Sequence, residues 1–375
     1  MLLVKEIFPQ IKIILLINEI FGMMKQLQSI NLSIHGIKVK CSSNNSEFIS
    51  YVNDHMSYFL TESNGNHNIE TKIWFKKNIN SRATMPSKKL GVNMYQDEEK
   101  LLYFEENLDV EASFSKNKMI INCQINNSFK FKASIKKIIK FLLGRRVEKS
   151  HDFFILIRRL IIFPLFHYME NYRDTFLMHA SAFKLDNKTV VMAGLANVGK
   201  STSSLSATLD LKGKFISDNY LLFNKSKVFC FPELVRVSDE ILDLIDNKNK
   251  LGKYLYVRGH RKLYALSPDK IVDSDKINSL VIPSLGNNCD YEDITLEYAI
   301  DLIMSSNEYV NEFHNTDFIS IINRVYPRSY SVLSNKIHAL RDLLKDVPIY
   351  LVTLSLDKSP KENIEYIMNI IHEKS

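Results

Sequence analysis

Cysteine is scarce in this 375-residue sequence, and its spacing builds no recognisable framework. The four cysteines, Cys41, Cys123, Cys230 and Cys289, lie far apart, with no CxxC pair and no histidine cluster beside them. The sequence therefore predicts neither a metal site nor a disulfide framework. Reduced thiols in the cytoplasm are the simplest expectation for such cysteines.

Long hydrophobic runs, internal repeats and low-complexity tracts are also missing. Ile11 to Met24 is mostly apolar, but Lys12 and Glu19 interrupt it, so the run is too short to span a bilayer. It also lacks the small-residue cleavage site of a secretory signal. Three interpretations of residues 1–23 stay open: a peripheral amphipathic helix, a packed helix, or an extension upstream of a start at Met24.

No strong excess of one charge is present. The net charge is +7, and hydrophobic residues make up 45% of the chain. These values are ordinary for a globular protein and predict no specific nucleic-acid partner. We expect an α/β protein in two parts: a smaller α+β domain at 24–150, of no predicted role, and a second domain at 151–375.

The first part has the alternating apolar pattern of strands. Leu32 to Val39 alternates with one irregularity at Gly36, which suggests a β-bulge. Glu47 to Leu60 is predicted to be a helix. Further strands are expected at Ile69–Phe75, Leu101–Phe104, Met119–Ile125 and Phe129–Ala133.

A helix is predicted from Asp152 to Tyr172, with Pro164 kinking or dividing it. It is apolar over most of its circumference, which favours a buried linker helix. Strands and helices then alternate, as is typical of an α/β nucleotide-binding domain. Strands are expected at Phe176–Phe183, Thr189–Ala193, Lys214–Ile216, Tyr220–Phe223, Val228–Phe231 and Ile349–Leu354, and helices at Lys200–Leu209, Asp239–Ile245, Leu296–Met304, Lys336–Leu344 and Lys361–His372.

One motif in this second part indicates chemistry. The segment Gly194-Leu195-Ala196-Asn197-Val198-Gly199-Lys200-Ser201 matches G-x-x-x-x-G-K-[ST], between a predicted strand and a predicted helix. Glycines let backbone N–H groups approach phosphate oxygens, and the helix N-terminus favours negative charge. Lys200 can reach the β- and γ-phosphates, the Ser201 hydroxyl can join the ligands of Mg²⁺, and Thr202 can support the α-phosphate. The sequence thus predicts a nucleoside triphosphate site.

Three further residues are candidates near this loop. Asp218 follows a short strand, where a carboxylate can hold Mg²⁺ or accept a proton from an attacking hydroxyl, although Ser-Asp-Asn is also good turn chemistry. His179 lies on the predicted strand before the one that leads into the phosphate loop, and it could sit beside the phosphates. Arg258, in a basic stretch with His260, Arg261 and Lys262, could neutralise phosphoryl charge, or the stretch could simply be a solvated loop.

A GTPase is disfavoured. Asp210-Leu211-Lys212-Gly213 lies too close to the phosphate loop to act as a GTPase switch motif. Neither Asn224-Lys225-Ser226-Lys227 nor Asn247-Lys248-Asn249-Lys250 carries the aspartate that reads guanine.

The order of motifs resembles the HPr kinase/phosphorylase family, and more closely the HPr-kinase-like proteins of modified-peptide biosynthesis. The similarity lies in Leu177 to Ala182 with His179, the phosphate loop, and Phe215 to Asn219, and it extends over about Tyr172 to Leu354. It implies a P-loop kinase domain of the phosphoenolpyruvate-carboxykinase-like type, using ATP and Mg²⁺. It further implies phosphoryl transfer to a serine-type hydroxyl, with Asp218, His179 and Lys200 as catalytic residues and Ser201 and Asp218 attending the metal.

The sequence departs from this family at two positions. Asn219 stands where the family has a second acidic residue, and Thr202 stands where the true HPr kinases have glutamate. HPr itself as a substrate and reverse phosphorolysis are therefore not expected. The acceptor is expected to be a hydroxyl on a peptide, protein or small molecule. A catalytically degenerate nucleotide-binding module is the alternative, and a homo-oligomer stays open.

Overall fold

The computed structural model describes residues 27–63, 65–76, 88–91, 93–97, 100–105, 108–115, 118–126, 149–309 and 330–374. Residues 1–23 and the predicted strand at Phe129–Ala133 lie outside these ranges. The architecture is mixed α/β with four sheets, of eight, six, four and three strands. Within the described residues, no helix is both long and apolar enough to cross a membrane.

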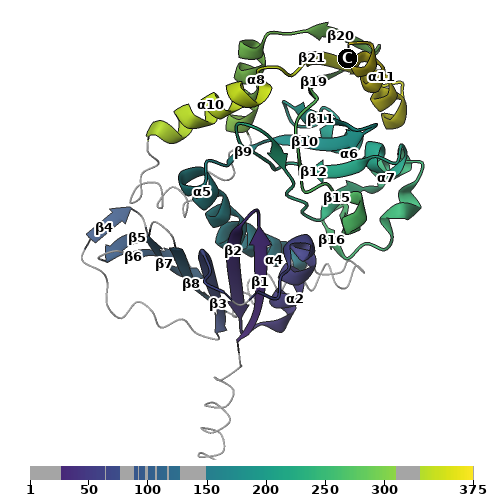
Figure 1. Cartoon of the computed structure of the whole chain (residues 1–375). Coiled ribbons are helices and arrows are strands. Elements are labelled where there is room, and N and C mark those ends of the chain that lie inside the picture. The colour runs from purple at the N-terminus through teal and green to yellow at the C-terminus, as the bar shows by residue number, and fades with distance from the viewer. Residues whose placement is uncertain are drawn as a thin grey trace, which may run out of the picture.

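The eight-stranded sheet contains all the described strands before residue 127. Its order is β1-β2-β3-β8-β7-β6-β5-β4, and α2 (Ser46–His55) packs beside β1 and β2 (Figure 1). The strands are β1 (Gln28–Ile34), β2 (Ile37–Ser43), β3 (Ile69–Lys76), β4 (Lys88–Gly91), β5 (Met94–Asp97), β6 (Lys100–Glu105), β7 (Leu108–Ser115) and β8 (Lys118–Asn126).

The β-bulge predicted at Gly36 is wrong. Leu32 to Val39 forms two antiparallel strands, with Ile34 opposite Ile37, and His35 and Gly36 make the turn between them. Both turn residues have positive φ, 47° and 83°. This is the backbone of a tight two-residue hairpin turn, which an interruption of alternation cannot distinguish from a bulge.

One long helical segment lies between the eight-stranded sheet and the rest of the protein (Figure 1). It comprises α4 (Lys149–Ile157), a π-helical turn η4 (Arg158–Ile162) and α5 (Phe163–Tyr172). Pro164 has no N–H to donate, and the ladder shifts to i→i−5 just before it, where Phe163 N–H donates to Arg158. The segment is thus divided near Pro164, and it is buried as predicted.

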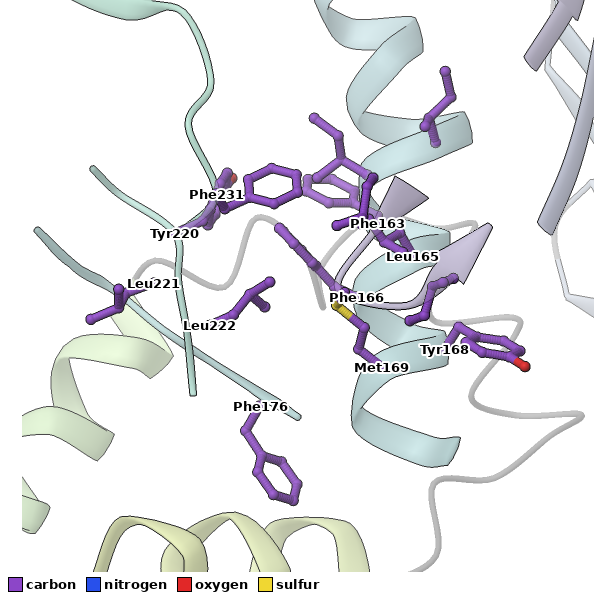
Figure 2. Packing of buried hydrophobic residues seen from close by; sticks show 14 of the residues in the cluster. Phe163, Leu165, Phe166, Tyr168, Met169, Phe176, Tyr220, Leu221, Leu222 and Phe231 are labelled. Carbon is purple, nitrogen blue, oxygen red and sulfur yellow. The ribbon is translucent and has the colours of Figure 1, made fainter. Parts of the chain in front are cut away.

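Both faces of this segment are packed. Toward the eight-stranded sheet, the Thr71 hydroxyl donates to the carbonyl of Leu160 at 3.0 Å. On the other side, Phe166 lies against Tyr220 and Phe231, with ring centroids 5.2 and 4.9 Å apart, as Figure 2 shows. A single apolar cluster runs through the segment from one side to the other.

The phosphate-loop region is built on the six-stranded sheet, whose order is β12-β10-β11-β19-β21-β20. Parallel pairs β11–β19 and β19–β21 form its centre, and β10, β12 and β20 add antiparallel edges. Helix α6 packs on β10, and α11 packs on α6. The elements are β10 (Ala180–Leu185), β11 (Lys188–Ala193), α6 (Lys200–Leu209), β12 (Lys214–Ser217), β19 (Ser279–Gly286), β20 (Asp290–Asp293), β21 (Ile349–Ser355) and α11 (Pro360–Glu373).

Two small sheets and further helices complete the chain. The four-stranded sheet has the order β18-β14-β13-β9, and the three-stranded sheet β15-β17-β16. These strands are β9 (Phe176–Met178), β13 (Leu221–Phe223), β14 (Val228–Phe229), β15 (Val235–Ser238), β16 (Tyr256–Arg258), β17 (Arg261–Tyr264) and β18 (Ser274–Asp275), and the helices are α7 (Asp239–Asp243), α8 (Leu296–Tyr309) and α10 (Tyr330–Leu344).

The single strand predicted at Phe176–Phe183 is therefore wrong. It breaks at His179, where β9 pairs with β13 in one sheet and β10 pairs with β11 and β12 in another. Because both pieces are apolar and extended, their pattern alone cannot reveal that the chain changes sheets.

Candidate nucleotide-binding site

The predicted phosphate loop has a distinctive backbone conformation. It joins β11 to α6, and Gly194, Asn197 and Gly199 all have positive φ, at 129°, 62° and 87°. Among the described residues, no backbone N–H from 195 to 198 donates to another backbone group. Residues 195–197 are exposed. A run of unpaired N–H groups ahead of a helix N-terminus is the usual receptor for phosphate oxygens.

The ammonium group of Lys200 lies inside this loop. Its Nζ donates to the carbonyl oxygen of Gly194 at 3.0 Å and also to that of Leu195. The residue is only 6% exposed. Burial lowers the pKa of Lys200 from 10.5 to about 8, although the negative charge of Asp218 opposes this shift. The cation is thus held at the loop by hydrogen bonds to two backbone carbonyls.

The carboxylate of Asp218 accepts hydrogen bonds from two hydroxyl groups at the start of α6 and in β10. Its Oδ1 accepts hydrogen bonds from Ser201 in α6 and from Ser181 in β10, both at 2.7 Å. Its Oδ2 accepts one from the Asn219 side chain at 3.2 Å. The carboxylate is therefore fixed on both oxygens, beside the hydroxyl that the motif assigns to Mg²⁺.

Strand register explains how these residues meet. In the β10–β12 pair, Ala182 lies opposite Ser217, which brings the preceding Ser181 beside the following Asp218. In the β10–β11 pair, Ala180 lies opposite Ala193, which brings His179 beside Gly194. The pairing of β10 with β11 and with β12 thus places His179 beside Gly194 and Ser181 beside Asp218.

His179 is held in its neutral form. Burial and the positive charge of Lys200 together lower the pKa of His179 to about 4, against the raising effect of a hydrogen bond with the Gly194 backbone. A neutral imidazole beside the loop can donate one hydrogen bond or accept one, but it adds no positive charge near neutral pH.

Asn219 adopts a left-handed backbone conformation, with φ of 65°. Asparagine and aspartate tolerate this region far better than other side chains with a Cβ. The backbone at 219 therefore suits asparagine or aspartate, but only asparagine can donate the hydrogen bond to Asp218.

Arg258 has its contact elsewhere. It ends β16 in a hairpin with β17, and its guanidinium carbon lies 3.7 Å from the centre of the Phe154 ring in α4. Arg158 and Arg236 also lie over that ring, at 4.8 and 5.7 Å. Arg258 thus packs on α4, whereas His260 and Arg261 of the same hairpin are exposed, and the phosphate-neutralising role of Arg258 stays a prediction.

Ser181 is the residue of this site that the sequence interpretation missed. It is fully buried and its hydroxyl bonds Asp218. The sequence does contain one indication of this residue, since a serine stands within the otherwise apolar strand segment Ala180-Ser181-Ala182-Phe183.

The residues present fit a magnesium ion. Mg²⁺ takes oxygen ligands and is usually bound by one or two carboxylates together with substrate phosphates. Asp218 supplies a carboxylate and Ser201 an exposed hydroxyl within one hydrogen-bonded group.

Comparison with known proteins gives only distant similarity. No protein-family model and no curated protein matches the chain. Among solved structures, similarity is found to the Hpr(Ser) kinase/phosphatase from Coxiella burnetii, at 14% sequence identity and a TM-score of 0.27, over 53% of this chain and 97% of that one. Similarity at this level establishes neither fold nor function, and the family membership expected from the motifs stays a prediction.

Proposed function

We propose that this protein is an ATP- and Mg²⁺-dependent phosphotransferase that phosphorylates a hydroxyl group on a peptide, protein or small molecule. The observation that carries the proposal is the direct hydrogen bond between Ser201 of the phosphate loop and Asp218. It joins the triphosphate-binding motif to a carboxylate that can act in phosphoryl transfer. A domain of the P-loop kinase type, related to the HPr kinases, is part of this proposal.

Each residue has a role that follows from its contacts. The loop N–H groups and Lys200 bind the β- and γ-phosphates, and phosphate oxygens replace the two carbonyls that Lys200 now bonds. Ser201 and Asp218 would hold Mg²⁺, which when bound neutralises charge on the phosphates. Asp218 Oδ2 accepts the proton of the acceptor hydroxyl, while Ser181 fixes Oδ1. Neutral His179 orients the γ-phosphate by a hydrogen bond.

A second function is favoured by one observation. Asn219 supplies an amide to Asp218 where a second carboxylate would strengthen metal binding and proton transfer. The alternative is thus a nucleotide-binding module without transfer activity, whose output is a change in binding to a partner.

Asp218→Asn tests the transfer role. The amide keeps the size of the side chain but removes the proton acceptor, so we expect phosphoryl transfer to fall by about 100-fold or more while ATP binding persists. Transfer is measured from radiolabelled ATP to a library of serine- and threonine-containing peptides and small alcohols. Binding is measured by titration with a fluorescent ATP analogue.

Asp186→Asn is the matched control. Asp186 is an exposed turn residue between β10 and β11 with φ of 49°, a conformation that asparagine also adopts. Its variant should transfer at the wild-type rate. Wild-type transfer by Asp218→Asn would remove the assigned role of Asp218. Tight ATP binding without any labelled product in the wild type would support the non-catalytic module.

A further inference from the structure

Three segments far apart in the sequence bring a histidine, a cysteine and an aspartate together. His35 lies in the β1–β2 turn, Cys230 follows β14, and Asp273 precedes β18. One potential ligand atom from each residue lies within 4.8 Å of the other two. The eight-stranded sheet and the four-stranded sheet meet at this cluster.

The spacing of these atoms is close to that of a tetrahedral metal site. His35 Nδ1 is 3.9 Å from Asp273 Oδ1, and Cys230 Sγ is 3.8 Å from the same oxygen. Ligands bound to zinc at its usual bond lengths lie roughly 3.5 Å from one another. Two of the three spacings are thus slightly longer than in a zinc site, and the third, between His35 and Cys230, is within 4.8 Å.

The orientation of His35 is that of a metal ligand. Its Nε2 lies 2.7 Å from the carbonyl oxygen of Cys230, and because a carbonyl only accepts, this nitrogen carries the proton. The lone pair is then on Nδ1, the atom nearest Asp273. Metal-binding histidines commonly donate their other N–H to a backbone carbonyl in this way.

The other two ligands are held by backbone structure. Cys230 N–H donates to the carbonyl of Asp273 at 2.8 Å, next to the paired strands β14 and β18. Cys230 is fully buried and its thiol is hydrogen-bonded with Tyr58. The side chain of Asp273 is 65% exposed. Its Oδ1 lies 3.9 Å from His35 Nδ1 and accepts a hydrogen bond from the Cys230 thiol at 3.8 Å, so this oxygen faces both other candidate ligands.

We propose that His35, Cys230 and Asp273 bind a zinc ion, with water as the fourth ligand. Imidazole, thiolate and carboxylate together suit zinc, whereas magnesium and calcium prefer oxygen ligands alone. On binding, the Cys230 S–H bond breaks, the proton leaves to solvent, and a sulfur–zinc bond forms. The ion would clamp the β1–β2 turn against β14 and β18, so its role is to stabilise the contact between the two sheets.

Zinc binding is tested on the full-length chain after chelator treatment, by calorimetric titration with zinc chloride. We expect one equivalent to bind to the wild type and to raise its melting temperature. His35→Asn, Cys230→Ser and Asp273→Asn should each weaken binding by about 10- to 100-fold or more. Asparagine at 35 tolerates the positive φ of that turn, and Asp273 is exposed, so these two variants should keep the fold.

Cobalt substitution identifies the sulfur ligand. A thiolate-to-cobalt charge-transfer band in the near ultraviolet is expected in the wild type and absent in Cys230→Ser. Cys289→Ser is the control, because its thiol bonds Asn363 in another part of the fold and should leave the band unchanged. Magnesium binding at Ser201 and Asp218 gives no such band. Absence of zinc binding in the wild type, or a band and affinity unchanged in Cys230→Ser, would overturn the proposal.

Discussion

The buried ammonium of Lys200 makes stability depend on pH in a way that one substitution can isolate. Lys200 is 6% exposed, and in the folded protein burial lowers the pKa of Lys200 from 10.5 to about 8. Lys200→Met replaces the ammonium with an apolar chain of similar length. We expect the difference in unfolding free energy between wild type and variant to grow in favour of the wild type as pH rises.

The sign and size follow from proton binding. Between pH 8 and pH 10.5 the lysine is protonated in the unfolded chain but largely neutral in the folded one, so the unfolded state binds more protons and stability rises with pH. A shift from 10.5 to about 8 corresponds to roughly 3 kcal/mol. Below pH 8 both states are protonated and the difference should be flat.

The assay is urea unfolding of both ligand-free proteins from pH 7 to pH 10.5. Tyrosines and other lysines titrate alike in the two proteins, so their contributions cancel in the difference. Lys225→Met, in an exposed turn, is the control and should show no such rise. If the difference in unfolding free energy between the wild type and Lys200→Met stays constant up to pH 10.5, burial does not lower the pKa of Lys200 as argued.

Three further outcomes are expected. Ser181→Ala removes one of the two hydroxyls on Asp218 Oδ1, so phosphoryl transfer should fall by about tenfold at nearly unchanged ATP affinity; an unchanged rate would contradict its positioning role. NMR titration of His179 should show an inflection near pH 4, since burial and the nearby lysine lower its pKa; an inflection near 6.5 would contradict this. Glu233→Ala should destabilise the fold by about 3 kcal/mol in thermal or urea unfolding, because it leaves His55 buried without its carboxylate, and a loss below 1 kcal/mol would contradict the buried pair.

Glu233 also gives an acid-sensitive contribution to stability. Burial would raise its pKa, but the hydrogen bond from His55 and the charges of Arg158 and Arg236 lower it to about 2. The folded pKa therefore lies below the ordinary 4.5. This contribution is fully present above pH 4.5 and is lost as pH falls toward 2.

The hydrophobic pattern of the sequence predicted those helices and strands whose structure depends mainly on residues close in sequence. Helix α11 follows from its apolar period and from Ser359 and Glu362, which cap its N-terminus reciprocally. The central strand β19 was missed, although it pairs with both β11 and β21. Its sequence, Ser279 to Gly286, contains Pro283 and lacks alternation, so period and propensity gave no clear signal.

The local structure of the predicted phosphate loop follows from the sequence alone. The strand, the glycine-containing turn and the helix are contiguous in the sequence. Gly194 and Gly199 adopt positive φ, which glycine allows because it has no Cβ. Asp218 was a candidate by its place after a short strand. Only the tertiary structure decided that its partners are Ser181 and Ser201, and that His35, Cys230 and Asp273 meet. Those contacts depend on strand register and on the packing of segments up to 238 residues apart, from His35 to Asp273, which no local spacing records.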